Sequence, residues 1–502
     1  MSKQYARSSA SGGYQQPRTK IPPTGHGYSS TQGLRTLHES FFEKVKDSRD
    51  QQVAALLKLA RLDSASPDYV NLKDGYGLSP LHWACWSGSV ELMKTLCSAG
   101  AGLNQKHKLY GTPLCVAALA GRAEIVATLL NLRCEIQGSG LYVGTALHAA
   151  CRHGHVDVVN VLLECGCNLD TVSMCLDNLA NIGFPRPGQA HLFASSYLRC
   201  SSMPAAIIGN RTKVVDILLT KGANLHGSWS TYGEYVPDSD TIMDADRPLT
   251  GYEIVPNLWK AIDCNSTDVA MLLIARGSMI DLCELQGADT PLMAATKSKN
   301  YHVAKALLDA GADVDRKNNA GQTAVYQTVL YNHRDGVLEM LKLLLARGAS
   351  PRLSARDLSW PIHMAAQHGR ADCIVVLLDS GSDVDPPDAW GQTPLMRACQ
   401  NSHINAVRLL LQRGGNVNLR DRNGCTALYL AVEGFGEEDP ALLRLLLSYR
   451  ADPKAQTNSG RSPLTLATYL KKNKFRDVLE PFYPREQMGL EEIYLRMARG
   501  QG

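Results

Sequence analysis

One eight-residue segment recurs along the chain at nearly constant spacing, and this recurrence restricts the fold more than any other feature. Clear copies begin at Gly77 (GLSPLHWA), Gly111 (GTPLCVAA), Gly391 (GQTPLMRA) and Gly460 (GRSPLTLA). The proline position of the nine recognisable copies is occupied by Pro80, Pro113, Ala146, Pro291, Ala324, Pro361, Pro394, Ala427 and Pro463. Most neighbouring copies are 33 residues apart. A unit of this size cannot bury an apolar face alone, so we expect an array of stacked units.

Each copy is built like the start of a helix. Thr or Ser precedes the proline position in most copies, where its side chain can cap a helix, and Pro suits the first helical residue. The apolar stretch that follows, such as HVAKALLDAGADVD at residues 302–315, predicts a second helix ending at a left-handed Gly. Two less regular copies, at residues 203–225 and 256–280, fill the gap before Pro291. We therefore expect eleven helix-turn-helix repeats.

The pattern T-P-L-H-x-A at a period near 33 residues resembles the ankyrin-repeat family. The resemblance extends over residues 34–482, which is nearly the whole chain. It implies an all-α repeat fold, an ankyrin-repeat solenoid of helix-turn-helix units with β-hairpin connections. It also implies non-catalytic recognition of proteins through the hairpin tips and the concave face formed by the first helices. The motif histidines His82, His148 and His363 would form hydrogen bonds within and between repeats.

The structure of the segments outside the array is predicted from their position and composition. Residues 1–33 carry four basic and no acidic side chains, with too little apolar content to fold alone, so we expect a disordered basic tail. Residues 34–70 are expected to form an N-terminal capping half-repeat. The repeats occupy residues 71–482, and residues 483–502 form a C-terminal capping helix or tail.

Two insertions interrupt the array at residues 171–197 and 227–250. Long loops in a compact array are usually functional or disordered. Aromatic residues and Pro in both insertions favour packed structure. A role in partner contact and a simple structural elaboration both stay open. The second insertion also contains an acidic run, made up of Glu234, Asp238, Asp240, Asp244 and Asp246.

Composition excludes several classes of protein. A formal net charge of +4 over 502 residues is too small to indicate binding to nucleic acid or to a membrane surface. No apolar run approaches the roughly 20 residues that a membrane-spanning helix needs, and the N-terminus contains no apolar signal region. The 14 cysteines are scattered, many in apolar helical stretches, which is typical of a reducing compartment. We expect a monomeric cytoplasmic protein, with the nucleus as an alternative location.

Three patterns could indicate bound ligands, but the spacing or the sequence context of each differs from what such a site requires. The acidic run does not follow the ligand spacing of a calcium loop. The glycines of GSGLYVG, at residues 138–144, coincide with a repeat hairpin and lack the companion motifs of a nucleotide site. Cys151, His153 and His155 lie close together, but no second ligand pair follows at zinc spacing. We therefore predict no catalytic residue, no cofactor, no metal and no enzymatic activity.

The candidate partner-binding residues lie in the first three repeats. Tyr76, Tyr110 and Tyr142 stand at or beside one repeat position at the hairpin tips, so stacking should align them in a row. Such aromatic residues are enriched in binding hot spots. The alternative, that each ring packs on the neighbouring hairpin and stiffens the array, stays open. Among the later tips, which carry small polar residues, Trp390 is the exception.

A second set of candidates follows the small residue pair of the first helix in the same three repeats. Trp86, Leu119 and Arg152 occupy this position, which faces the concave side in the ankyrin family. We therefore expect a binding surface made by the tips and the inner helices of the N-terminal repeats.

The leading functional hypothesis is an intracellular scaffold or adaptor that binds other proteins. One alternative is a signalling or transcriptional inhibitor that masks a basic partner segment, and only the acidic second insertion favours it. Another is a ubiquitin-ligase substrate adaptor. The tail at residues 485–502 lacks the Leu-Cys-Arg core of a SOCS box. This absence weakens the ligase-adaptor hypothesis but does not exclude it.

Overall fold

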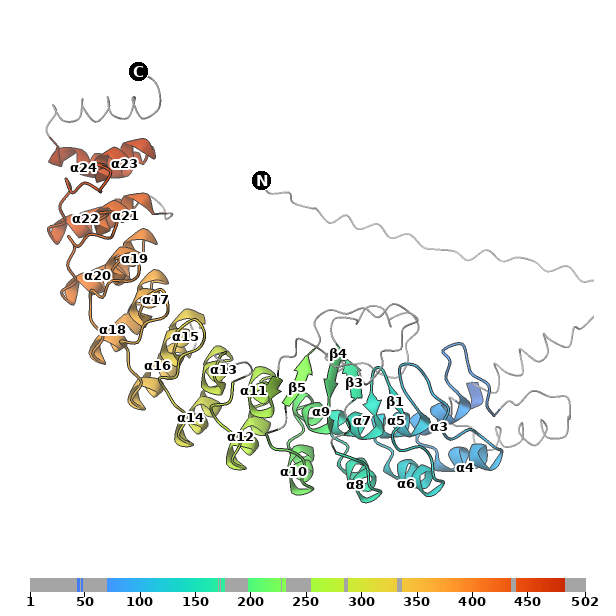
Figure 1. The fold of residues 1–502 in the computed structure, drawn as a ribbon. Coiled ribbons are helices and arrows are strands. Elements are labelled where there is room, and N and C mark those ends of the chain that lie inside the picture. The colour runs from blue at the N-terminus through green and yellow to red at the C-terminus, as the bar shows by residue number, and fades with distance from the viewer. Residues whose placement is uncertain are drawn as a thin grey trace, which may run out of the picture.

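The computed structural model describes residues 43–45, 47, 70–169, 171, 173–176, 197–226, 228–231, 254–283, 288–331, 336–434 and 439–483. These residues contain eleven pairs of short helices, stacked into a curved array (Figure 1). The expected all-α repeat fold is confirmed. The expected tail at 1–33 lies outside the described residues, as do nearly all of the expected caps at 34–70 and 483–502.

The first helix of each pair begins at the proline position of a repeat. Thr290, Thr393 and Ser462 precede such helices in extended backbone, and their hydroxyls accept hydrogen bonds from the N–H three residues later. These caps, with Pro next in the chain, fix where the helix starts. The first helices are α3 (Pro80–Ser87), α5 (Pro113–Leu119), α7 (Ala146–His153), α9 (Ser202–Ile208), α11 (Asn257–Asp263), α13 (Pro291–Lys297), α15 (Ala324–Tyr331), α17 (Pro361–Gln367), α19 (Pro394–Gln400), α21 (Ala427–Glu433) and α23 (Pro463–Tyr469).

The second helix of each pair is amphipathic. In α14, for example, Val303, Ala304 and Leu307 are buried, and Gly311 ends the helix region with φ +91°. The second helices are α4 (Val90–Ser98), α6 (Ala123–Asn131), α8 (Val156–Glu164), α10 (Thr212–Thr220), α12 (Thr267–Ala275), α14 (Tyr301–Asp309), α16 (Val337–Ala346), α18 (Ala371–Asp379), α20 (Ile404–Gln412), α22 (Pro440–Ser448) and α24 (Asn473–Leu479), which the 3-10 helix η1 (Glu480–Phe482) follows.

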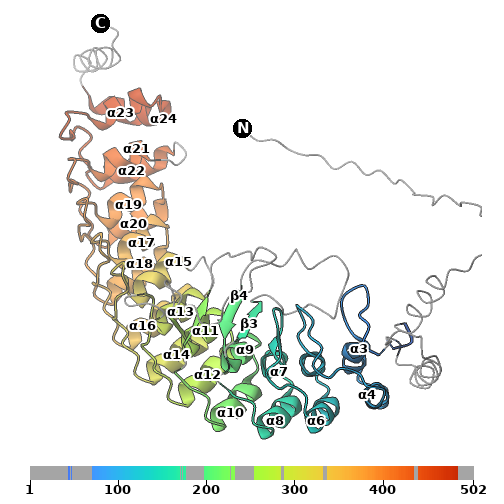
Figure 2. The same ribbon diagram turned by 45° about the vertical axis from the view of Figure 1, so that its right-hand side comes forward.

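The two sets of helices form two parallel layers. First helices contact the first helices of neighbouring repeats, and second helices contact second helices. Figure 1 shows the first helices along the inner side of the curve and the second helices along its outer side, and Figure 2 shows the same array from a second direction. The apolar core is therefore one continuous layer between the two sets, shared by every pair of neighbours. Each repeat depends on its neighbours to bury its core face.

Hairpins connect the repeats, and the two insertions lengthen them into a small sheet. The strands are β1 (Ser139–Gly140), β2 (Gly144–Thr145), β3 (Ser173–Leu176), β4 (Tyr197–Cys200), β5 (Ser228–Thr231) and β6 (Ile254–Pro256). Strands β3, β4, β5 and β6 pair in that order, and all are antiparallel. The insertions expected as loops at 171–197 and 227–250 thus begin as strands that extend two neighbouring hairpins. Residues 177–196 and 232–250 lie outside the described residues.

The motif His, which is the third residue of the first helix, links one repeat to the next. The Ser79 N–H and hydroxyl lie 3.2 and 2.7 Å from His82 Nδ1, so this nitrogen accepts, and His82 Nε2 donates to the Gly111 carbonyl at 3.2 Å. His363 does the same: its Nδ1 accepts from the Trp360 N–H at 3.0 Å and its Nε2 donates to the Gln392 carbonyl at 3.1 Å. The family expectation for these two histidines is confirmed.

Other residue types form the same link where the motif has decayed. Trp259 Nε1 donates to the Asp289 carbonyl at 3.2 Å, and the Tyr326 hydroxyl lies 2.8 Å from Ser359 Oγ. Both contacts reach the hairpin of the following repeat. The irregular fifth repeat therefore keeps the inter-repeat hydrogen bond although its sequence has lost the histidine.

A second link runs from the turn between the two helices to the preceding repeat. His155 Nε2 donates to the Leu119 carbonyl at 3.0 Å, and His403 Nε2 donates to the Gln367 carbonyl at 3.0 Å. These carbonyls lie at the C-terminal end of a first helix, where intrahelical partners are missing. The glycine between the helices leaves room for the next repeat's side chain, since a Cβ on Gly121 would lie 2.6 Å from His155 Nδ1.

The packing generates a first prediction, for Leu147 in α7, whose side chain is buried. Leu147→Ala should lower the free energy of unfolding by about 2–5 kcal/mol, because it removes apolar contacts and leaves a cavity. Urea titration followed by circular dichroism would measure the loss. Leu132→Ala, at an exposed leucine, is the control and should change stability by less than about 0.5 kcal/mol. Equal midpoints for both variants would contradict the assigned register.

The buried histidines generate a second prediction, on pH. Burial lowers the pKa of His82 and of His363 to about 4, from 6.5 in the unfolded chain. The unfolded state therefore binds more protons between pH 6.5 and 4, and stability should fall as the pH falls through this window. The loss should approach about 3 kcal/mol per histidine.

Urea midpoints of the intact chain at several pH values would measure this loss. His82→Gln should flatten the dependence, whereas His302→Gln, at an exposed histidine of α14, should leave it unchanged. A wild-type midpoint that is constant from pH 7 to 4 would contradict the prediction.

Candidate functional site

The N-terminal candidate surface contains one exposed tyrosine. Tyr76 is 40% exposed at the tip of the hairpin before α3. Its N–H donates to Asp74 Oδ1 at 3.0 Å, and its carbonyl accepts from His107 Nε2 at 2.9 Å. The backbone of Tyr76 is therefore fixed between its own turn and the next hairpin, while the ring remains accessible.

Two of the three candidate tyrosines are largely buried. Tyr110 and Tyr142 are only 8% and 7% exposed, and their rings pack edge to face with centroids 6.1 Å apart. The His107 ring lies 5.3 Å from Tyr110 on the preceding turn. Edge-to-face packing of this kind stabilises the contact between hairpins. The alternative interpretation, that these two rings stiffen the array, is the one the geometry favours.

The three inner-helix candidates have equivalent backbone contacts and different exposures. The carbonyls of Trp86, Leu119 and Arg152 each accept a hydrogen bond from a turn side chain of the following repeat. Trp86 and Leu119 are half-buried, whereas Arg152 is only 8% exposed. Burial removes Arg152 from the accessible surface, so Tyr76, Trp86 and Leu119 remain as the N-terminal candidates.

A second surface lies at the tips of the eighth and ninth repeats. Trp390 is 52% exposed at the tip before α19, and the guanidinium carbon of Arg397 lies 5.3 Å from the centre of its ring. Arg397 donates to Asp388 Oδ2 at 3.1 and 2.6 Å and to Gln367 Oε1 at 2.9 Å. The indole is thus supported by an arginine that three hydrogen bonds hold in place.

Asp388 anchors this arrangement from below. Its side chain is fully buried, and Oδ1 accepts from the N–H groups of Trp390 and Gln392, both at 2.8 Å. One carboxylate therefore orders the turn through Oδ1 and positions Arg397 through Oδ2. The Trp390 side chain stays half exposed on this support.

Leu358 stands on the neighbouring tip in an unfavourable backbone conformation. It is 50% exposed and has φ +57°, at the turn position that Gly321, Gly391 and Gly424 fill in other repeats with φ between +73° and +77°. The Ala389 N–H donates to the Asp357 carbonyl at 2.9 Å, which joins the two tips. We call the set of Leu358, Trp390 and Arg397 the Trp390 surface.

An ion pair lies at the inner helix of the sixth repeat. Lys297, the last residue of α13, pairs with Asp289, and its Nζ lies 4.8 Å from the centre of the exposed Tyr331 ring. Burial alone would raise the pKa of Asp289, but hydrogen bonds from Lys297, Asn318 and Gln327 outweigh it and lower that pKa. This carboxylate stays ionised and holds the lysine in place.

Sequence reasoning noted Trp390 without assigning it a role, and it missed Leu358 and Arg397. A signal for Leu358 was present, because a branched residue stands where other repeats have Gly. The support from Arg397 could not be read from the sequence, since it depends on how Gln367 and Asp388 meet across two repeats.

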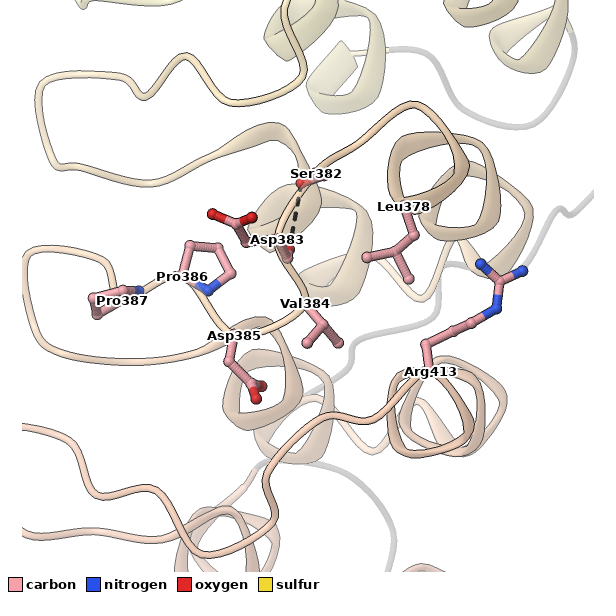
Figure 3. Close-up of a pocket in the computed structure, with 8 residues that line it drawn as sticks. All are labelled: Leu378, Ser382, Asp383, Val384, Asp385, Pro386, Pro387 and Arg413. Atoms are coloured by element: carbon pink, nitrogen blue, oxygen red, sulfur yellow. Dashed lines mark hydrogen bonds between the residues drawn. The ribbon is translucent and has the colours of Figure 1, made fainter.

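A hollow of about 670 Å³ lies between the loop after α18 and the end of α20 (Figure 3). Asp383, Asp385 and Arg413 are among its lining residues, and burial raises the pKa of Asp385. Small-molecule sites are mostly apolar with a few polar groups, whereas charged residues and prolines make up much of this lining. We interpret it as a notch between stacked repeats.

Within the described residues, no group of three or more His, Cys, Asp or Glu side chains is placed to hold a metal ion. The twelve cysteines whose side chains the structure describes are all free, and burial raises the pKa of thiols such as Cys134, to about 11. None of the helices described is both long and apolar enough to cross a membrane.

Comparison with known proteins gives one family. The model described as Ankyrin repeats (3 copies) matches residues 81–173, 258–355, 333–421 and 362–457, together more than half of the chain. The human ASB11 ankyrin repeat domain, a solved structure, is 26% identical with a TM-score of 0.40, over 45% of this chain and 97% of that one.

Two curated relatives show how far the likeness extends. Transient receptor potential cation channel subfamily A member 1 of Homo sapiens is 30% identical over 204 residues, 33% of this chain and 18% of that protein. B-cell lymphoma 3 protein homolog of Mus musculus is 31% identical over 204 residues, 39% of this chain and 43% of that protein. The chain thus spans less than half the length of either relative.

The Trp390 surface generates a third prediction. Arg397→Met should lower stability by about 1–3 kcal/mol, because it leaves the buried Asp388 carboxylate without its cation. The loss stays at the low end of what a fully buried pair costs because Asp388 keeps two backbone donors. Urea unfolding would measure it.

Arg413→Met is the matched control for Arg397→Met. The Arg413–Asp379 pair, at 2.7 Å, has side chains 37% and 60% exposed. Its loss should cost less than about 1 kcal/mol. Similar costs for the two variants would show that Asp388 does not depend on Arg397.

Proposed function

The chain belongs to the ankyrin-repeat family, and from that membership we propose that it is an intracellular, non-enzymatic adaptor that binds partner proteins through its inner face and hairpin tips. Ankyrin repeats bind other proteins, and proteins of this family are generally interaction modules without catalytic activity. The proposal assigns the contact to particular residues of this chain.

The observation that carries the proposal is the fixed, half-exposed indole of Trp390. Trp is among the residues enriched in binding hot spots. Arg397, Asp388 and Gln367 order the residue before any partner arrives. A side chain that is already ordered loses little conformational freedom on binding, so more of the contact energy contributes to affinity.

The N-terminal surface supports a second contact within the same function. Tyr76, Trp86 and Leu119 lie on the first two repeats, and their backbone is held by neighbouring repeats. An array with accessible aromatic residues near both ends suits a protein that brings two partners together.

The test compares proteins captured from a cell extract by the immobilised intact chain and by three variants. Trp390→Ser removes one surface, and Tyr76→Ser with Trp86→Ser removes the other. Tyr301→Ser is the matched control, because Tyr301 is an exposed aromatic residue on the second helix α14. We expect each surface variant to lose specific proteins that the control retains, at unchanged melting temperature. An identical set of captured proteins for all four chains would refute the proposal.

A further inference from the structure

In the hairpin tips of the eighth to tenth repeats, two carboxylates are buried and two arginines are exposed. Asp388 and Asp421 are buried, and each accepts hydrogen bonds from N–H groups of its own turn. Arg356 and Arg422 are exposed. The carboxylates therefore act as caps inside the turns, and the guanidinium groups face the solvent.

The two arginines flank the apolar pair. Arg356 lies two residues before Leu358 on the eighth tip. The Arg422 N–H donates to the Trp390 carbonyl at 3.0 Å, and the Arg422 side chain runs beside Gly391, where a Cβ would lie 3.3 Å from its Cγ. Within the described residues neither guanidinium belongs to an ion pair. The exposed residues along the tips are thus, in order, a cation, a leucine, a tryptophan and a cation. Asp357, between Arg356 and Leu358, is half-buried, and its Oδ1 accepts from the Ser359 N–H and hydroxyl.

The backbone of Leu358 adds evidence that Leu358 and Trp390 serve contact with a partner. A leucine at φ +57° is strained relative to the glycine found at the same place in neighbouring turns. Its side chain gains little from burial because it is half exposed. Neither backbone preference nor packing explains a large apolar residue here, whereas contact with a partner does.

We propose that Leu358 and Trp390, with Arg356 and Arg422, bind an extended acidic segment of a partner protein in which Asp or Glu residues flank a large apolar side chain. This inference rests on the proposed function and specifies its ligand. The apolar side chain lies on Leu358 and the open face of Trp390, and the carboxylates pair with the two arginines. A basic segment, the ligand of the masking hypothesis, would be repelled at this surface.

A peptide fits these residues better than a nucleic acid does. Single-stranded nucleic acid needs a continuous cationic track along its backbone with aromatic platforms for successive bases. Here two apolar side chains separate the cations, and one of them is aliphatic. One face of the only exposed indole at these tips is already covered by Arg397.

The probe is a short fluorescein-labelled peptide with Glu and Asp around a central Leu-Phe, titrated with the intact chain by fluorescence anisotropy. Three comparison probes are a peptide with Lys for each acid, a peptide with Ser for Leu-Phe, and a single-stranded oligouridine. We expect the acidic apolar peptide to bind at least about tenfold more tightly than each of the others, and more weakly at high salt. Equal binding of the Lys peptide, or tighter binding of the oligouridine, would overturn the proposal.

Charge reversal tests the arginines. Arg356→Glu with Arg422→Glu should weaken the acidic peptide at least about tenfold and improve binding of the Lys peptide. The matched control is Lys305→Glu with Arg408→Glu, two exposed cations on the second helices α14 and α20, which should leave both affinities unchanged. An equal loss of peptide affinity in the two double variants would mean that only the overall charge matters, and it would overturn the proposed site.

Leu358→Gly separates a binding role from a structural one. Glycine relieves the left-handed backbone, so the melting temperature should equal or exceed that of the wild type while peptide affinity falls. Retained affinity, or a clearly lower melting temperature, would overturn the assignment of Leu358. If Trp390→Ser loses captured proteins but the acidic peptide does not bind, the adaptor function stands and this ligand is wrong.

Discussion

The inner surface of this protein depends on a hydrogen bond between consecutive repeats. A side chain in the turn between the two helices donates to a carbonyl at the end of the preceding first helix, as His155 does to Leu119 and His403 to Gln367. The bond satisfies a helix terminus that would otherwise lack a partner. It also fixes the backbone of the residue that presents the concave side chain. The array can therefore change its surface side chains without changing the bonds that position them.

The inter-repeat links explain why the irregular middle of the chain still folds as part of the array. At the third residue of the first helix, different side chains can supply this donor, although Met293 and Met396 at the same position supply none. His82 and Trp259 both donate a ring N–H to a carbonyl of the next hairpin, although an imidazole and an indole differ in size. Nearest-neighbour bonds and a shared apolar layer are the conditions of solenoid stability, and both persist where the motif does not.

The sequence predicted the helices and their starts because these depend on local chemistry, such as Thr before Pro at Thr290. It did not predict which tip residues are exposed. Leu78 separates Gly77 from Ser79, whereas Gly111 precedes Thr112 directly, so Tyr110 is displaced by one residue relative to Tyr76. That displacement accompanies a change from 40% to 8% exposure. Exposure depends on the path of each hairpin against its neighbour, which no single-repeat pattern contains.

Charge illustrates the same limit at the level of the partner. The chain has nearly equal numbers of acidic and basic residues, and its one clear acidic run suggested a basic partner. In the hairpin tips, however, the carboxylates of Asp388 and Asp421 cap the turns, because a buried N–H requires an acceptor. The arginines of these tips do not cap the turns, and their side chains remain at the surface. The charge presented to a partner is therefore set by the side chains that do not cap the backbone, and at these tips that charge is positive.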